Sequence, residues 1–190
     1  MANKKIAIFA SGNGSNFQAI AEAAAAGRLN AEVVLAVTDN PDAHVLERAA
    51  SMGVDTLALR PKAFKSKALY EEAIMEQLQR REVQWLVLAG YMRLVGPVLL
   101  DAYPGRIVNI HPSLLPAFPG KDAIGQTLAS GRREAGVTVH TVDAGMDTGP
   151  IIAQRSFLIG SRNRSEVEEE IHRIEHEMYP SVLQKLFSRA

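Results

Sequence analysis

Asn109 and His111 stand two residues apart at the end of the apolar run "RIVNIH", and a proline-rich segment, residues 112–119, follows them. On a strand, side chains at positions i and i+2 point the same way, so the amide and the imidazole would face one spot. Two such N–H donors suit a developing oxyanion. The alternative is a histidine that is hydrogen-bonded for purely structural reasons at a strand end.

The segment "DAGMDTGP" offers two acids that could serve the histidine, Asp143 and Asp147. A carboxylate beside an imidazole favours its charged form and fixes its orientation. The residue pattern does not choose between the two aspartates, and both also fit ordinary turn chemistry.

A glycine-rich segment, "SGNGSN", lies between the first apolar run and the first helical pattern. Gly12, Asn13, Gly14, Ser15 and Asn16 could turn backbone N–H groups inward at a helix start, where a phosphate binds well. The simpler interpretation is a strand-to-helix turn with Ser15 or Asn16 as N-cap. We favour the phosphate, because doubly wound sheets bind ligands at this position.

A dinucleotide fingerprint is the other interpretation of the same segment. Gly12 and Gly14 match the first two glycines of G-x-G-x-x-G, and Asp39 stands about where a ribose-binding acid is expected. Phe17 replaces the third glycine, which normally lets helix and strand pack closely. The motif is incomplete, and Asp39 also fits a turn into the next helix.

"HRIEH", residues 172–176, matches the zinc motif H-x-x-E-H. We favour a charged helix surface on which both histidines pair with glutamates, since no third ligand is evident, and we predict no metal. His44 and His140 carry no signal beyond a helix surface and a strand face.

The elements that would position these residues alternate along the chain. Continuous apolar runs are typical of strands covered on both faces, and helical patterns separate them, which predicts a parallel sheet. The expected strands are Ile6–Ala10, Val33–Val37, 55–60, Trp85–Ala89 and 106–111; the helical faces comprise Phe17, Ile20, Ala21 and Ala24, then Leu69, Ala73, Ile74 and Leu78.

Residues 137–142 and 151–159 instead alternate like more exposed strands and predict an antiparallel edge. A last helix should start at an N-cap Ser165, and Pro180 should kink or interrupt it. The prediction is a single-domain (residues 1–190) Rossmann-like three-layer α/β fold, its mostly parallel sheet ending in an antiparallel edge and carrying helices on both faces.

Composition narrows the function. Lysine plus arginine equals aspartate plus glutamate at 21 each, so no net field favours nucleic acid or a membrane, and neither is expected as a partner. With no cysteine there is no thiolate nucleophile or disulfide framework. The first apolar run is too short for a signal peptide, and no segment reaches membrane-spanning length, so we expect a cytoplasmic protein.

Several segments together resemble the glycinamide ribonucleotide (GAR) formyltransferase family of folate-dependent purine synthesis: "SGNGSN", "LAGYMRLV", "NIHPSLLPAFPGKDA", "VTVH", "DAGMDTGP" and "IEHEMYP". The resemblance runs in order from about Ile6 to Pro180. It implies that Asn109, His111 and Asp147 are catalytic and that 10-formyltetrahydrofolate is the co-substrate.

The resemblance also implies two binding sites. Gly14, Ser15, Asn16 and Glu175 would bind GAR, whereas Lys67, Met92, Arg93, Leu94, Val95 and Asn109 would bind the folate. Lys67 stands where some members have arginine, so the charge stays but bidentate pairing is lost. The resemblance assigns no role to Arg162 or Arg164.

The chemistry that the resemblance implies is direct transfer. The amine of GAR would attack the formyl carbon, Asn109 and His111 would stabilise the oxyanion, and Asp147 would orient His111 and relay a proton. The prolines would limit loop freedom before substrate arrives. Rival functions are methionyl-tRNA formyltransferase and formyltetrahydrofolate hydrolase, which usually carry an extra domain that this chain should lack, and a non-catalytic nucleotide-binding module. Both a monomer and a homodimer are compatible with the sequence.

Overall fold

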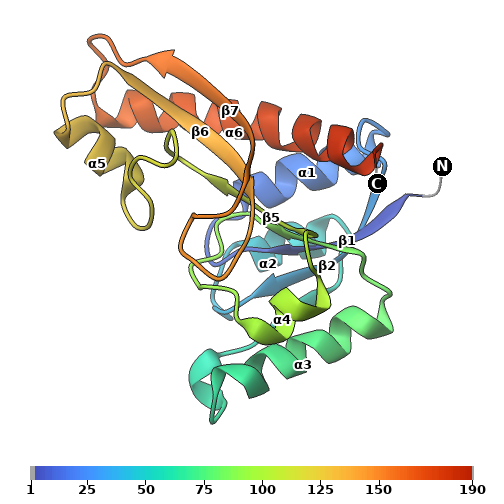
Figure 1. The fold of residues 1–190 in the computed structure, drawn as a ribbon. Helices are drawn as coiled ribbons and strands as arrows, with labels where there is room; N and C mark the ends of the chain where they lie inside the picture. The colour runs from blue at the N-terminus through green and yellow to red at the C-terminus, as the bar shows by residue number, and fades with distance from the viewer. Residues whose placement is uncertain (1–2, 190) are drawn as a thin grey trace.

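A seven-stranded sheet runs through the molecule in the order β3-β2-β1-β4-β5-β6-β7 (Figure 1). The computed structural model describes residues 3–189. The strands are β1 (Lys4–Phe9), β2 (Ala31–Thr38), β3 (Thr56–Ala58), β4 (Trp85–Leu88), β5 (Ile107–His111), β6 (Glu134–Thr141) and β7 (Ile151–Leu158). The helices are α1 (Ser15–Ala25), α2 (Val45–Ser51), the short 3-10 helix η1 (Pro61–Ala63), α3 (Lys67–Arg80), α4 (Pro97–Ala102), α5 (Ala123–Ala129) and α6 (Arg164–Phe187).

The first five strands are parallel, and β6 and β7 add an antiparallel edge. All seven expected strands are present, and the predicted three-layer α/β class is confirmed. Parallel pairing follows from the chain order, because a helix after each strand returns the chain to the same end of the sheet. The carboxyl ends of β1, β4 and β5 therefore meet at one edge.

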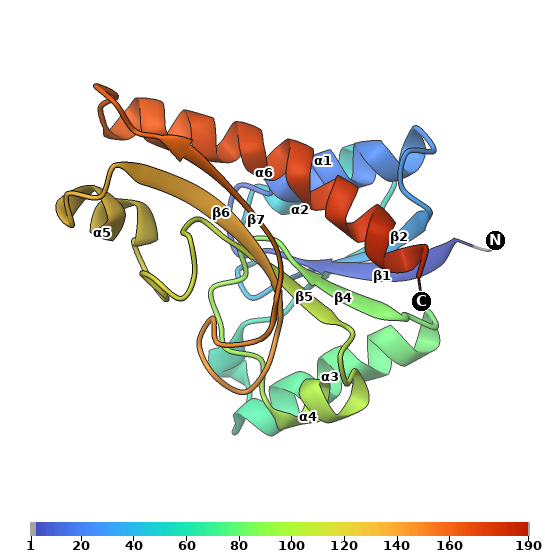
Figure 2. The same cartoon turned by 45° about the horizontal axis from the view of Figure 1, so that its top comes forward.

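Helices cover both faces of the sheet (Figure 2). Helices α1, α2 and α6 pack on one face against Ile6 and Ile8, whereas α3 and α4 pack on the other against Ala7 and Phe9. Alternate residues of one strand thus serve two separate cores, which explains the continuous apolar runs. On α3, Ile74 and Leu78 are buried in the second core and the neighbouring Leu69 is exposed.

Helix α6 differs from its prediction at its start. Asn163, not Ser165, is the N-cap: its side chain accepts the Glu166 N–H, and the Glu166 carboxylate accepts the Asn163 N–H in return. This capping box satisfies two otherwise unpaired donors, which a cap at Ser165 would not do.

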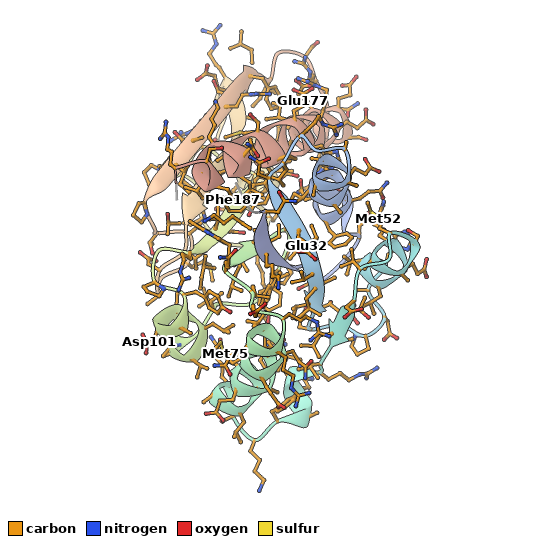
Figure 3. The ribbon with its side chains drawn as sticks, turned by 90° about the vertical axis from the view of Figure 1, so that its right-hand side faces the viewer. Glu32, Met52, Met75, Asp101, Glu177 and Phe187 are labelled. Atoms are coloured by element: carbon orange, nitrogen blue, oxygen red, sulfur yellow. The ribbon has the colours of Figure 1, made fainter. Side chains whose placement is uncertain are left out.

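The expected interruption at Pro180 is also wrong, because α6 continues through this residue to Phe187. Buried side chains on either side of the proline hold the helix on the sheet, and at its end the Phe187 ring lies 5.3 Å from that of Trp85. Figure 3 labels Phe187 on this helix. That burial offsets the lost hydrogen bond. Within residues 3–189, no helix is both long and apolar enough to cross a bilayer.

Strand β6 is more buried than its alternating pattern indicates. Residues 135–140 are all buried, whereas β7 is largely exposed as expected. The reason is that β6 is an interior strand under α6, and the segment after β5 lies against it: Thr138 Oγ1 donates to the Ser113 carbonyl and accepts the Leu115 N–H. Its polar residues are therefore buried and paired.

Candidate active site

Two neighbouring strands, β5 and β6, bring together the polar side chains of the site. In their antiparallel register Asn109 lies opposite His140 and His111 lies opposite Thr138. Side chains directly opposite one another project to the same face of a sheet. Asn109 and His111 therefore share one face, as predicted, and His140 joins them.

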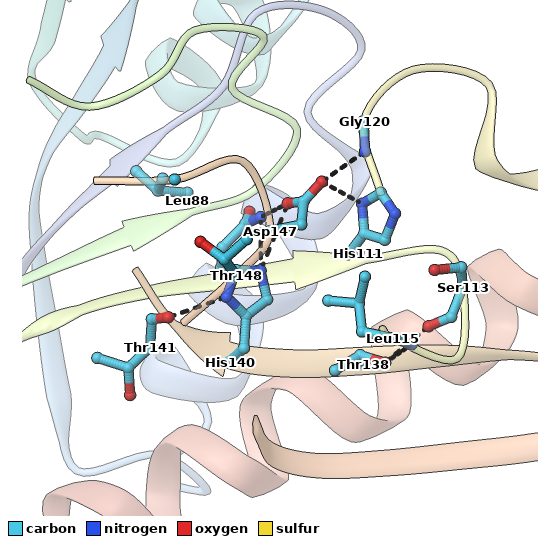
Figure 4. A network of polar contacts seen from close by, with 12 residues as sticks. Leu88, His111, Ser113, Leu115, Gly120, Thr138, His140, Thr141, Asp147 and Thr148 are labelled. Carbon is cyan, nitrogen blue, oxygen red and sulfur yellow. Dashed lines mark hydrogen bonds and ion pairs between the residues drawn. The ribbon is translucent and has the colours of Figure 1, made fainter. Parts of the chain in front are cut away.

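Asp147 enters the same spot from the segment between β6 and β7 (Figure 4). Its Oδ2 lies 3.4 Å from His111 Nδ1 and accepts the Gly120 N–H at 2.7 Å. Its Oδ1 lies 3.4 Å from Asn109 Nδ2 and 3.5 Å from His140 Nε2. One carboxylate thus contacts the amide and both imidazoles.

Backbone carbonyls determine where the two histidines hold their protons. A carbonyl oxygen only accepts, so His140 Nδ1 donates to Thr141 (2.9 Å) and His111 Nε2 donates to Phe118 (2.8 Å). His140 Nε2 is then free to accept from the Asn109 amide at 3.3 Å. His111 Nδ1 instead faces the Asp147 carboxylate, with Oδ2 at 3.4 Å.

The environment of Asp147 keeps its carboxylate ionised. Burial alone would raise the pKa of Asp147, but the Gly120 N–H that it accepts and the neighbouring His111 ring lower the pKa below its ordinary value. Both histidines are nearly buried, at 6% exposure for His111 and 2% for His140. The cluster is a largely buried carboxylate with two imidazoles and an amide beside it.

Asp143 does not reach the cluster. Its Oδ1 accepts from the Thr148 hydroxyl at 2.7 Å and from the Gly145 N–H at 3.0 Å, and its side chain is exposed. It stabilises the turn that presents Asp147. Of the two aspartates that the sequence left open, the structure therefore places Asp147 beside His111.

The glycine-rich segment forms the second part of the site. Gly14 is the N-cap of α1 at φ 78°, and no side chain caps the helix, so the expected N-cap role of Ser15 or Asn16 is wrong. A Cβ on Gly14 would lie 2.6 Å from Val45 Cγ2, which leaves no space for another residue. Arg48 braces the segment from α2 by donating to the Asn13 carbonyl at 2.7 Å.

Ser15 and Asn16 point toward α6 instead. Asn16 Nδ2 donates to Glu175 Oε2 at 3.1 Å, and the same oxygen accepts from His172 Nδ1 at 3.2 Å. Ser15 Oγ lies 3.1 Å from His176 Nε2. The histidines of the zinc-like motif thus have separate partners, and residues 3–189 contain no cluster of three potential metal ligands.

Residues 91–96, between β4 and α4, form the third part. Met92 and Leu94 are exposed by 70% and 46%, Arg93 Nε donates to Asp39 at 2.9 Å, and Val95 is buried in the core under α3. Asp39 is therefore bound to this segment instead of standing free at a ribose position. The contribution of Val95 to a ligand site is limited to its backbone.

Three cations singled out by the sequence lie on or near helices α3 and α6. Lys67 is exposed at the first position of α3, beside the 91–96 segment. Arg164 pairs with Asp122 and Glu168, both at 2.7 Å, and Arg162 donates to the Leu158 carbonyl at 2.7 Å. The two arginines thus hold the start of α6 in place.

Sequence reasoning missed three polar residues of the site. His140 was invisible because its role depends on the strand register opposite Asn109. Ser11 joins two segments far apart in sequence: its N–H donates to the Gly90 carbonyl and its Oγ accepts the Met92 N–H, both at 2.9 Å. Glu71, in a charged helical stretch, is buried. Only a contact map could have revealed them.

Known proteins share this architecture and sequence. A family model described as formyl transferase matches residues 4–183. The phosphoribosylglycinamide formyltransferase of Bacillus subtilis (strain 168) is 53% identical over 96% of this chain and 94% of its own length, and that of Escherichia coli (strain K12) is 35% identical over 94% and 84%. The crystal structure of glycinamide ribonucleotide transformylase 1 from Geobacillus kaustophilus superposes with a TM-score of 0.94 at 57% identity, over 97% of this chain and 98% of that one. This chain therefore belongs to the formyl transferase family, among the phosphoribosylglycinamide formyltransferases.

Proposed function

We propose that this formyltransferase of purine biosynthesis uses Asn109, His111 and Asp147 to pass the formyl group of 10-formyltetrahydrofolate to the amine of GAR. The observation that supports the assignment is that one ionised carboxylate, Asp147, lies within 3.4 Å of both the Asn109 amide and the His111 ring. An amide donor and a charged imidazole are thus oriented in one place before substrate binds.

The amine nitrogen of GAR attacks the formyl carbon, and the carbonyl electrons move onto oxygen. The Asn109 amide donates to this oxyanion in exchange for one of its long contacts to Asp147 and His140. His111 donates in exchange for the Phe118 carbonyl. Contacts of 3.3–3.4 Å lie at the long end of the hydrogen-bond range, so the exchange at Asn109 costs little. Collapse of the oxyanion then breaks the bond to N10.

The attacking amine loses a proton, and N10 of the folate gains one as it leaves. Asp147 holds His111 in its charged form and relays the proton through a water molecule. No covalent enzyme intermediate is required, and we propose that no metal takes part.

The two substrates approach from different segments. The uncapped start of α1, with Gly14, Ser15 and Asn16, supports a phosphate site, and the contact between Asn16 and Glu175 supports a role for Glu175 in accepting from the ribose hydroxyls. Exposed Met92 and Leu94 support an apolar folate site in which the backbone of residues 92–95 contacts the pterin and Lys67 faces the glutamate tail. Asn109 would contact both substrates.

The test is a spectrophotometric assay with a chromophoric 10-formyl folate analogue, run with GAR and with water alone. We expect folate release that needs GAR and falls strongly in His111→Ala, with exposed Asp143→Asn as the matched control. Release without GAR would indicate a hydrolase. A folded protein that binds GAR and releases nothing would indicate the binding module. The cytoplasmic location and the choice between monomer and homodimer stay predictions, which fractionation and sedimentation would test.

A further inference from the structure

Side chains from outside residues 91–96 hold this segment in place. The side chains of Met92 and Leu94 are 70% and 46% exposed, so their own packing does not hold the segment. The anchors are Ser11 at the start of the phosphate segment, Asp39 at the end of β2, and Tyr70 and Glu71 on α3. Of these, the two α3 residues are adjacent in sequence and reach opposite ends of the segment.

Glu71 binds the end of the segment at an unusual cost. Its carboxylate is 2% exposed, and Oε1 accepts the Gly96 N–H at 2.5 Å. Its Oε2 is buried without a hydrogen-bond partner among the described residues. Burying a carboxylate is expensive unless all its lone pairs are satisfied, so packing alone does not account for an acid here.

Gly96 is matched to this carboxylate. A Cβ at position 96 would lie 2.9 Å from both Glu71 oxygens and from Lys67 Cε. The backbone conformation of Gly96, φ −97°, is open to any residue, so the glycine is required by the close approach and not by its dihedral angle. The short hydrogen bond to Glu71 therefore depends on glycine at position 96.

Tyr70 binds the beginning of the segment. Its hydroxyl lies 2.8 Å from that of Tyr91, and the Tyr91 ring packs edge-on against Phe9 with centroids 5.3 Å apart. Burial, followed by the hydrogen bond with Tyr70, raises the pKa of Tyr91, and burial also raises the pKa of Tyr70, so both phenols stay protonated and can share this bond. Adjacent residues of α3 therefore hold both ends of the segment.

We propose that Glu71 and Tyr70 are positioning residues for the folate: they fix the backbone of residues 91–96 in the conformation that contacts the pterin. The inference rests on the proposed folate site. Because Lys67 stands one helical turn before Glu71, α3 also sets the distance between the pterin segment and the cation for the glutamate tail.

The experiment compares Glu71→Ala and Glu71→Gln with Glu72→Ala, the exposed neighbour on the same helix. We expect Glu71→Ala to raise KM for the folate about tenfold, with KM for GAR and kcat within about twofold of the parent, the pattern of lost ground-state binding. The folate KM of Glu71→Gln should lie between those of Glu71→Ala and Glu72→Ala, because its amide oxygen can still accept the Gly96 N–H. Tyr70→Phe should raise the same KM by about threefold.

A double-mutant cycle tests the route. If Glu71 acts through Gly96, then Gly96→Ala should raise KM for the folate alone and combine with Glu71→Ala non-additively. An unchanged folate KM in folded Glu71→Ala, equal losses in both KM values and kcat, or additive effects would overturn the inference. Leu94→Ala distinguishes failure of the proposed folate site from failure of the positioning role. If Leu94→Ala raises the folate KM while Glu71→Ala does not, the folate site stands and the positioning role is wrong. If neither variant raises it, both the site and the role are wrong.

Discussion

The proposed catalytic cluster (Asn109, His111, His140 and Asp147) and the proposed folate segment (residues 91–96) hold their functional groups in opposite ways. In the cluster, the side chains themselves are buried on adjacent strands, and backbone carbonyls fix the proton of each histidine. In residues 91–96, the side chains of Ser11, just after β1, and of Glu71 on α3 bind backbone N–H groups, whereas the Met92 and Leu94 side chains remain exposed. Reacting groups need one orientation, while a binding surface needs a fixed backbone and free apolar side chains.

Substitutions in the proposed catalytic cluster should have the largest effect, and this effect should be on kcat. Asn109→Ala and Asp147→Asn should each lower kcat by on the order of hundredfold or more, because they remove the oxyanion donor or the charge that orients His111. Both KM values should stay nearly unchanged in Asp147→Asn, whereas Asn109→Ala should also raise KM, since Asn109 contacts both substrates in the proposed site. Steady-state kinetics on folded protein measure this. Near-normal turnover in either variant would exclude the assigned roles, and Asp143→Asn should behave like the parent.

His140 tests whether burial in the cluster amounts to function. His140→Ala should lower kcat by about tenfold, since the Asn109 amide loses the acceptor that orients it, while the amide itself remains. A His140→Gln variant, whose side-chain oxygen can accept in the same direction, should recover part of the loss. If His140→Gln is as slow as His140→Ala, orientation is not the explanation.

The folate segment should respond in KM and not in kcat. Leu94→Ala should raise KM for the folate by about fivefold, because the folate would cover only the exposed part of this side chain, which contributes about 1 kcal/mol of the roughly 1.5–3 kcal/mol for a fully buried leucine, and 1.4 kcal/mol is tenfold. KM for GAR is the internal control. A fall in kcat without a change in the folate KM would place Leu94 with the reacting groups. The proposed difference between the cluster, which affects kcat, and residues 91–96, which affect the folate KM, would then be wrong.

The smallest effect is on stability in acid. Because the folded protein lowers the pKa of Asp147, its ionised form stabilises the fold above the ordinary pKa of about 3.8, and this stability is lost as the pH falls through the lowered value. Chemical denaturation from pH 7 to pH 3 should show the parent losing its advantage over Asp147→Asn only below about pH 4. Asp101→Asn, an exposed acid on α4, should follow the parent. An advantage that persists unchanged to pH 3 would contradict the lowered pKa.

Local pattern was enough for the architecture and for one half of the cluster. Apolar runs and, at residues 137–142 and 151–159, alternation predicted the strands, and the i, i+2 spacing predicted Asn109 and His111 on one face, since all of these depend only on strand geometry. Asp147 was visible but not distinguishable from Asp143. Both acids lie in one glycine-rich turn, and only its folded path shows that Thr148 and Gly145 engage the first.

What escaped prediction depends on partners distant in sequence. Whether β6 is exposed, whether His140 meets Asn109 and whether a helical glutamate is buried are settled by register and by the packing of α6 and α3. The cap at Asn163 is the exception, because its pairing with Glu166 follows a local rule: a capping residue precedes its glutamate by three positions. The uninterrupted helix at Pro180 again reflects tertiary packing that outweighs a local cost.

Ser11 carries a consequence for building chimeras from relatives of this chain. One residue donates its N–H to the Gly90 carbonyl and accepts the Met92 N–H at its hydroxyl, yet it also begins the glycine-rich segment that leads into α1. The conformations of residues 11–16 and 90–96 therefore depend on each other, although the two segments are far apart in sequence. A crossover at any position between these two segments takes them from different parents. The recombined enzyme should therefore keep its affinity for both substrates only when residue 11 still forms both hydrogen bonds with the new 90–96 segment.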